Sequence, residues 1–120
     1  MKILFCRPPR YRWVFHSKHS SFWQPLAFAS MAAVLRENCE DIDVEILDCP
    51  IEEMGWHATE KAMGRRKPDI LCIGDETVSS HEALKLARMT KDLFPECIVI
   101  AGGLYFAHAI EDSLRDHPID

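Results

Sequence analysis

The feature that most constrains this chain is a regular alternation of short β-branched segments with longer segments of helical periodicity. Four segments are predicted to be strands: Lys2–Cys6, Asp43–Leu47, Asp69–Gly74 and Cys97–Gly102. The first, third and fourth are apolar at successive positions, which is typical of parallel strands covered on both faces of a sheet. The second alternates in polarity and carries Glu45, so we expect it nearer an edge.

The segments between these strands have helical patterns. They cover Pro25–Asn38, Gly55–Arg66, a stretch that begins at Ser79, and Ala107–Arg115. The first is apolar around most of its circumference, so we expect it to be buried on more than one side. The third opens with Ser79-x-x-Glu82, the pattern of a capping box. In the fourth, Ile110 and Leu114 are expected to face inward.

Strands that alternate with helices are joined by right-handed crossovers and form a parallel sheet. The sequence therefore predicts an α/β fold of the flavodoxin-like (Rossmann-like) type, a three-layer αβα domain. Its 120 residues match the size of one domain, which we place over residues 1–120. Because the rhythm calls for another strand after His117–Asp120, we expect a fragment of a larger protein that lacks the fifth strand.

Composition and motifs set several classes of function aside. The net charge of −5 argues against nucleic acid or an anionic membrane surface as partner, and no apolar run approaches the ~20 residues of a membrane span. Five cysteines without a C-x-x-C pair indicate a reduced, cytoplasmic protein. The sequence contains no P-loop, no G-x-G-x-x-G and no G-x-S-x-G. We therefore assign no catalytic residue and no metal ligand to the chain itself.

Ligands of open α/β sheets bind beyond the carboxyl ends of the strands. Three predicted loops meet there: Arg7–Gln24, Asp75–Ser80 and Gly103–Phe106. The first is long and mixes basic with aromatic side chains, which cover a flat ligand or another protein surface, or fold back over the core. Its His16 and His19 lack nearby carboxylates or thiolates in the sequence, so we interpret them as ordinary loop residues.

The other two loops carry small and hydroxyl-bearing residues. Thr77, Ser79 and Ser80 stand at a predicted helix start, where hydroxyls and backbone N–H groups suit a phosphate or an amide oxygen. Ser79 is equally explained as a helix cap. Gly102 and Gly103 follow a strand directly and let a bulky ligand approach without meeting a Cβ. A tight turn alone needs one glycine, so the pair favours a ligand.

The order and spacing of these segments resemble a known family. KILFCRPPR, PLAFASMAAVLREN, VEILDC and KPDILCIGDETVSSHEALKLARMTKDLFPECIVIAGG together are similar to the cobalamin-binding domain that precedes many radical S-adenosylmethionine enzymes. In that family the strand-end loops clasp the corrin ring and its nucleotide tail. Carried over by position, the resemblance implies cofactor contacts at Pro8, Pro9, Thr77, Val78, Ser79, Gly102, Gly103, Leu104 and Tyr105, with Phe106 also against the tail.

Two departures narrow the resemblance. Methionine-synthase-type and mutase-type domains place D-x-H-x-x-G after the first strand, its histidine being the lower ligand of cobalt, whereas this chain has RPPRYR there. The residues thus resemble the radical-enzyme subgroup, much of which lacks that motif. The C-x-x-x-C-x-x-C of the iron–sulfur cluster is also absent. The resemblance therefore implies a 4Fe–4S cluster and S-adenosylmethionine in a missing downstream domain, where methyl transfer, or ring-forming or rearrangement chemistry, would occur.

Two other interpretations of these residues stay open. The chain is also consistent with a degenerate interdomain or protein-interaction module of the same fold that no longer binds cobalamin. The aromatic and basic first loop, the apolar first helix and the missing lower-ligand histidine favour that reading. A flavin or another small molecule bound by the same fold is the third interpretation.

Overall fold

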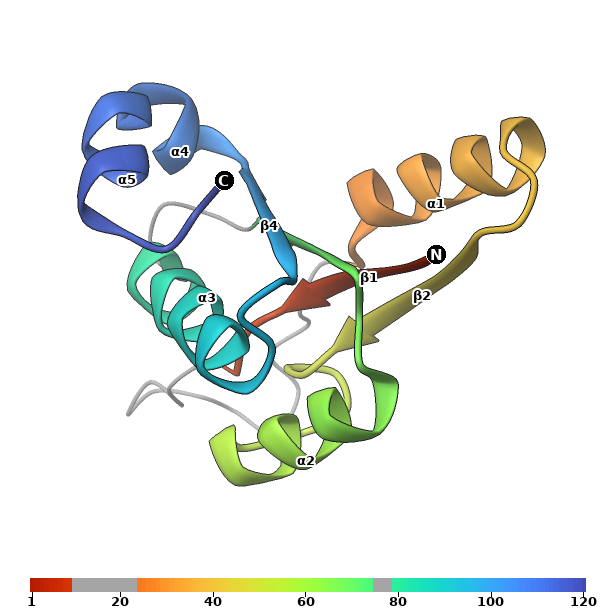
Figure 1. The fold of residues 1–120 in the computed structure, drawn as a ribbon, viewed down its shortest axis with the longest axis horizontal. Helices are drawn as coiled ribbons and strands as arrows, with labels where there is room; N and C mark the ends of the chain where they lie inside the picture. The colour runs from red at the N-terminus through yellow and green to blue at the C-terminus, as the bar shows by residue number, and fades with distance from the viewer. Residues whose placement is uncertain (10–23, 75–78) are drawn as a thin grey trace.

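A parallel sheet with helices on both faces forms the body of the chain (Figure 1). The computed structural model describes residues 1–9, 24–74 and 79–120. The strands are β1 (Lys2–Arg7), β2 (Asp43–Asp48), β3 (Ile70–Gly74) and β4 (Ile98–Gly102). The helices are α1 (Leu26–Asn38), α2 (Trp56–Arg66), α3 (Ser80–Leu93), α4 (Leu104–His108) and α5 (Ile110–Asp116). The predicted α/β flavodoxin-like fold is confirmed.

The described strands lie in the order β2-β1-β3-β4, and every pairing is parallel. Ile3 pairs with Val44 on one side and with Ile70 on the other, so β1 is central. The alternating strand β2 lies at an edge, as its polarity predicted. The chain steps outward from β1 in both directions, so the order reverses between β1 and β3. In open α/β sheets, ligands bind in the crevice beyond the carboxyl ends of the two strands between which the order reverses.

The two faces of the sheet carry separate cores, because successive residues of a strand point to opposite sides. On one face, α2, α3 and α4 pack over the larger core, in which Leu71, Met63 and Leu86 are fully buried. On the other face, α1 is the only helix in the described part of the chain, and its Phe28 lies against Phe5. Figure 1 shows α1 on the side of the sheet opposite α2 and α3. No helix in the described part of the chain is long and apolar enough to cross a membrane.

Helix α1 is less buried than its apolar sequence predicted. Its buried residues are Phe28 and Ala32, which face the sheet. Leu26, Met31 and Val34 are 68%, 45% and 58% exposed. The prediction of burial on more than one side is therefore wrong for the described chain. The sheet covers one side of α1, and the described residues supply no second element against the other side.

The segment after β4 also differs from its prediction. Instead of one helix over Ala107–Arg115, α4 and α5 meet at Ala109. Ile110 and Leu114 are 56% and 52% exposed, so the prediction that they face inward is wrong. The core contact comes instead from Phe106 of α4, which lies one turn earlier than the predicted stripe and packs into the larger core.

Helix α3 follows its predicted pattern along its length but not at its start. Ala83, Leu86 and Thr90 are fully buried on one stripe against the sheet. Ser79 is the N-cap residue, yet its side chain makes no capping hydrogen bond, and its backbone angles (φ −112°, ψ 13°) are not those of a usual cap. The capping box that the sequence predicted is therefore not formed.

Candidate functional site

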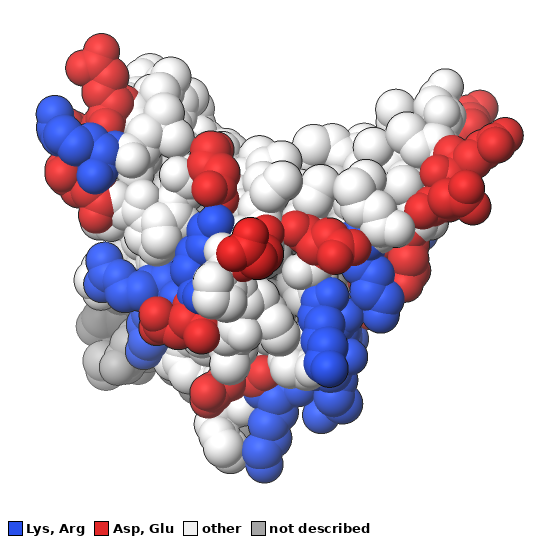
Figure 2. Space-filling model, in the orientation of Figure 1, with Lys and Arg blue, Asp and Glu red and all other residues white. Residues whose placement is uncertain are grey.

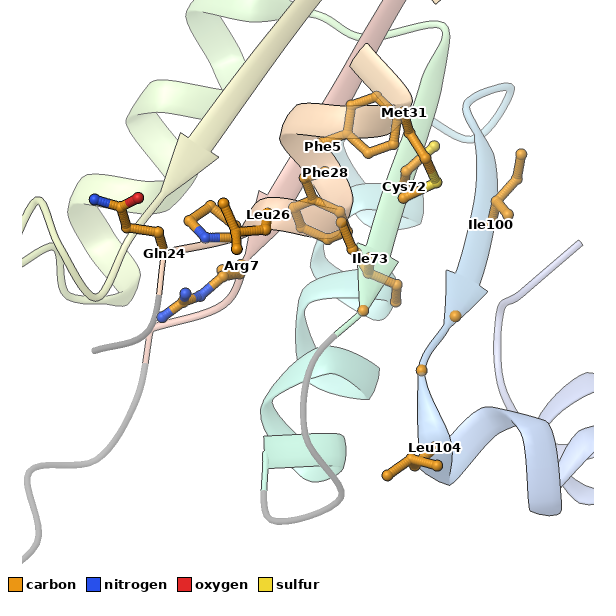
Figure 3. A pocket seen from close by; sticks show the side chains of 15 residues that line it. Phe5, Arg7, Gln24, Leu26, Phe28, Met31, Cys72, Ile73, Ile100 and Leu104 are labelled. Atoms are coloured by element: carbon orange, nitrogen blue, oxygen red, sulfur yellow. The ribbon is translucent and has the colours of Figure 1, made fainter. Parts of the chain in front are cut away.

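An apolar pocket of about 520 Å³ opens where β1, β3 and β4 end, on the face that α1 covers (Figure 3). Its position coincides with the reversal of strand order between β1 and β3. Its volume falls within the roughly 300–1,000 Å³ typical of sites for small molecules and cofactors. Size, place and lining make this pocket the candidate functional site.

The pocket is a slot between a helix and the sheet. Phe28 projects from α1 and packs on Phe5 of β1, their ring centroids 5.2 Å apart and their planes inclined by 39°. Cys72 and Ile100 come from β3 and β4, and Met31 stands above them on α1 (Figure 3). The three strand residues share one face because a strand's side chains alternate between two sides. The resulting walls suit a flat apolar group.

Three glycines shape the end of the slot, each for a different reason. A Cβ at Gly74 would lie 3.0 Å from the carbonyl oxygen of Gly102, so the close approach of the two strand ends requires glycine there. Gly103 has φ 99° and ψ 176°, a backbone conformation that is essentially restricted to glycine. A Cβ at Gly102 would meet no described atom within 4 Å. The missing side chain of Gly102 therefore leaves open space at the pocket.

One cation stands at the pocket's polar end. Among the described lining residues, Arg7 alone carries a formal charge. Its Nε lies 3.4 Å from Oδ1 of Asp48, at the neighbouring end of β2, and both side chains are almost completely buried. The same carboxylate oxygen accepts a hydrogen bond from the backbone N–H of Ile51. Because Asp48 compensates Arg7, the pocket has a partly neutralised guanidinium at one end and apolar walls elsewhere.

The thiol of Cys72 belongs to the wall of the pocket rather than to reactive chemistry. Burial, with a smaller contribution from Cys97, raises the pKa of the Cys72 thiol to about 11. At neutral pH the group is protonated and behaves as a small apolar side chain. Within residues 1–9, 24–74 and 79–120, no three His, Cys, Asp or Glu side chains gather as a possible metal site.

A pair of thiols lies on the opposite face of the sheet. The sulfur atoms of Cys6 and Cys49 are 4.0 Å apart in the larger core, and the Thr59 hydroxyl donates a hydrogen bond to Cys49. Their mutual hydrogen bond, with burial, raises the pKa of Cys6, whereas the same hydrogen bond lowers that of Cys49. This pair does not line the pocket.

The structure places part of the predicted cofactor set at the pocket. Gly102, Gly103 and Leu104 line it. Thr77 and Val78 lie outside the described residues. The structure therefore brings the turn after β4 together with side chains from β1, β3 and α1.

The remaining predicted residues lie near the same edge of the sheet but are not among the pocket's lining. Pro8 and Pro9 are buried directly after β1, and Ser79 is buried at the start of α3. Tyr105 packs against the larger core and makes an edge contact with Phe106, at a centroid distance of 5.2 Å. Whether any of these positions touches a cofactor stays a prediction.

Sequence reasoning did not single out the apolar walls. Phe5, Cys72 and Ile100 are ordinary strand residues in the sequence, and Phe28 and Met31 are ordinary members of an apolar helix. The sequence signal that could have indicated these walls was the unusual apolarity of that helix, which carries more apolar residues than one buried face requires. Which of its residues border the slot follows from register and helix orientation, which no local pattern specifies.

The fold and the pocket define an α/β domain of flavodoxin-like type with an apolar pocket at the reversal of strand order. No model of a known protein family matches the chain, and no solved structure matches it. A Pyrococcus horikoshii protein named an uncharacterized methyltransferase is 27% identical over 118 residues. That match covers 98% of this chain and 25% of the relative, so the chain spans about a quarter of the relative's length.

Proposed function

We propose that this chain is the cobalamin-binding module of a radical S-adenosylmethionine enzyme, and that the slot beside α1 receives the nucleotide tail of the cofactor. The single observation that carries the proposal is the apolar slot at the reversal of strand order, with open space at Gly102. The sequence resemblance supplies the cofactor class. The geometry supplies a place in which a flat aromatic base fits.

The residues present fit such a tail. Phe28 of α1 offers one wall and Cys72 and Ile100 of the sheet offer the other, so an aromatic base would be buried between apolar surfaces on both sides. Burying apolar area in this way contributes roughly 25 cal/mol per Å². Arg7 would place a positive charge near a phosphodiester, with Asp48 limiting its strength. The described lining contains no histidine, so its proposed role is binding and positioning, without a bond to cobalt.

In this proposal the chain's residues bind, orient and shield, and the chemistry is the cofactor's. When bound, cobalamin supplies methyl-group transfer or assists a ring-forming or rearrangement reaction. The methyltransferase name of the Pyrococcus horikoshii relative favours the first of these. The relative's greater length is consistent with a downstream domain that would hold a 4Fe–4S cluster and S-adenosylmethionine. Reduced cysteines are part of the same proposal, which places the protein in the cytoplasm.

The proposal is tested by mixing hydroxocobalamin with the full-length protein, removing unbound cofactor by gel filtration and recording the visible spectrum. We expect the unsubstituted full-length protein to retain corrinoid after gel filtration. Gly102→Val should weaken cobalamin binding by roughly tenfold or more, because the new side chain fills the open space beside Gly102. A tenfold change in affinity corresponds to about 1.4 kcal/mol of binding free energy. Gly64→Val in α2 is the matched control, because a Cβ there also meets no described atom within 4 Å.

A second readout reports the pocket itself rather than the colour of the cofactor. In a Cys39→Ser background, which removes an exposed thiol, alkylation of Cys72 at pH 9 should slow when cobalamin is bound. A full-length protein that retains no corrinoid, or equal binding by the Gly102 and Gly64 variants, would overturn the proposal. A yellow protein with flavin absorbance would instead assign the slot to a flavin, the third interpretation of the sequence.

One observation favours a second candidate, the interaction module. Leu26, Met31 and Val34 leave an aliphatic surface exposed along α1. If Gly102→Val leaves the activity of the full-length protein unchanged while Val34→Asp abolishes it, the interaction module replaces the cofactor module as the best account.

A further inference from the structure

Two thiols are in contact where β1 ends and the chain leaves β2. The sulfur atoms of Cys6 and Cys49 are 4.0 Å apart, although the two residues are 43 positions apart in the sequence. Both side chains are fully buried in the larger core, and both thiols are free. Cys6 pairs with Leu47, two residues before Cys49, so the parallel register of β1 and β2 holds the two thiols together.

The two thiols differ in what surrounds them. Cys49 accepts a hydrogen bond from Cys6, and the hydroxyl oxygen of Thr59 lies 3.4 Å from its sulfur. That hydroxyl also lies 3.0 Å from the carbonyl oxygen of Gly55, and its single hydrogen can turn to the sulfur when the sulfur is negatively charged. The hydrogen bond from Cys6 and, less strongly, that from Thr59 lower the pKa of Cys49 against the effect of burial. Cys49 is therefore the thiol that ionises first.

The chain after Cys49 can expose its sulfur. Cys49 begins a turn in which residues 51–53 are exposed, and Glu53 has φ 51°, a left-handed conformation that costs energy in any residue but glycine. Cys6, by contrast, lies in the central strand and is paired on both sides. Figure 2 shows charged side chains of both signs over the lower part of the molecule, where α2 lies in Figure 1, as on a solvated surface. Short exposed turns open more readily than paired strands, so Cys49 can move while Cys6 stays in place.

We propose that Cys6 and Cys49 are a modification site, at which a hydroperoxide forms a disulfide that ties the end of β1 to the turn after β2. A disulfide needs sulfur atoms about 2.0 Å apart, so the two sulfurs must approach by about 2 Å. The turn at Cys49 supplies this movement. The inference does not rest on the binding of cobalamin, because neither thiol lines the pocket.

The reaction takes place in two steps and consumes one molecule of hydrogen peroxide. The Cys49 thiolate attacks one peroxide oxygen, the O–O bond breaks, and the other oxygen leaves as water with the proton that Cys49 gave up. Cys49 is then a sulfenic acid. The Cys6 sulfur attacks the Cys49 sulfur, the S–O bond breaks, and a second water leaves with the proton of Cys6. Two thiols are oxidised to one disulfide, and the peroxide is reduced to two waters.

The cross-link has a structural consequence for the candidate site. Residues 6 and 49 bracket α1, so the disulfide encloses the helix wall of the pocket in a covalent loop. A cross-link that closes a long loop stabilises the folded state, mainly by restricting the unfolded chain. We expect the melting temperature of the full-length protein to rise by several degrees after oxidation and to return after treatment with dithiothreitol. An unchanged melting temperature in the cross-linked protein would overturn the tie between β1 and the turn.

Peptide mapping tests the bond itself. The full-length protein with Cys39→Ser, which removes an exposed thiol, is reduced, treated with hydrogen peroxide, alkylated and digested. We expect a Cys6–Cys49 disulfide peptide that dithiothreitol cleaves. Cys72 and Cys97 are the internal controls and should be recovered as alkylated thiols. Recovery of Cys6 and Cys49 as free thiols, or of Cys49 as a sulfinic acid without the cross-link, would overturn the proposal.

Substitution of Thr59 tests the assignment of Cys49 as the attacking thiol. Thr59→Val removes the hydroxyl and should slow formation of the disulfide by roughly twofold to tenfold, the range of one lost hydrogen bond. Thr59→Ser is the matched control, because it keeps the hydroxyl and should react at a rate close to that of the parent. Equal rates for the two variants would overturn the role of Cys49.

Discussion

The two faces of the sheet are built from the same strands but differ in how completely their side chains are buried. On the face covered by α2 and α3, Leu71, Val99 and Leu86 are fully buried. On the face covered by α1, Ile98 and Ile100 are half exposed, although each is a direct neighbour of Val99 in β4. The first face is closed by side-chain packing, and the second leaves apolar side chains of β4 half exposed. Neighbouring apolar residues of one strand can therefore differ completely in burial.

The difference also explains where the candidate site lies. Among the described residues, the closed face is filled by side chains from α2, α3 and α4, which form the larger core. On the open face, α1 is the one helix among the described residues, and a slot remains between it and the ends of the strands. In this molecule the site follows from incomplete coverage of the sheet rather than from a cluster of polar residues.

The largest expected effect compares one residue from each face in the 120-residue chain. Leu71→Ala should lower the free energy of unfolding by about 3 kcal/mol, because the side chain is fully buried and a cavity remains. Ile98→Ala should change it by about 0.5 kcal/mol or less, because half of that side chain already meets water. Urea unfolding measures both. Equal losses would show that the open face is covered in solution.

A smaller effect separates the two glycines at the strand ends. Gly74→Ala should cost about 1–2 kcal/mol, because the new Cβ lies 3.0 Å from a backbone oxygen that cannot rotate away. Gly102→Ala should stay within about 0.5 kcal/mol of the parent, because its Cβ enters open space. The free energies of unfolding in urea provide the comparison. A costly Gly102→Ala would contradict the open space at the end of the slot.

The smallest effect concerns the outer edge of β4. The Lys91 ammonium, and then the Val99 N–H, hold the pKa of Asp120 below its usual value. A carboxyl with a depressed folded-state pKa contributes stability above its unfolded pKa of about 3.9, and this is lost as pH falls through the folded pKa. Asp120→Asn should therefore lower stability at pH 7 by about 0.3 kcal/mol, because the pair is exposed. The variant and the parent should melt together near pH 2, and a difference that persists there would exclude the charge as its cause.

Local patterns predicted the strands and the main stripe of α3 because both depend on short-range periodicity. The same patterns failed where burial depends on a neighbour. Helix α1 is apolar on several sides, yet whether Met31 and Val34 are covered depends on which element packs there. Ile110 and Leu114 carried the right spacing for a buried stripe, but the break at Ala109 turned α5 so that both are exposed.

In the candidate site, too, the sequence singled out some residues, and only the structure revealed the others. The sequence singled out Gly102 and Gly103 because two glycines after a strand exceed the needs of a turn. It gave no reason to separate them, and only the backbone angles of Gly103 and the space beside Gly102 assign each a role. Phe5, Phe28 and Cys72 became wall residues through parallel register and the placement of α1, which join positions far apart in the chain.

By itself, the sequence determined the fold class, the parallel arrangement and the edge of the sheet at which a ligand would bind. These follow from alternating periodicities and the handedness of crossovers, which short stretches of chain encode. Only the tertiary structure decided which face of the sheet stays open, what walls the slot has and where Asp120 lies. Those features depend on packing between distant segments, so no single stretch of the sequence contains them.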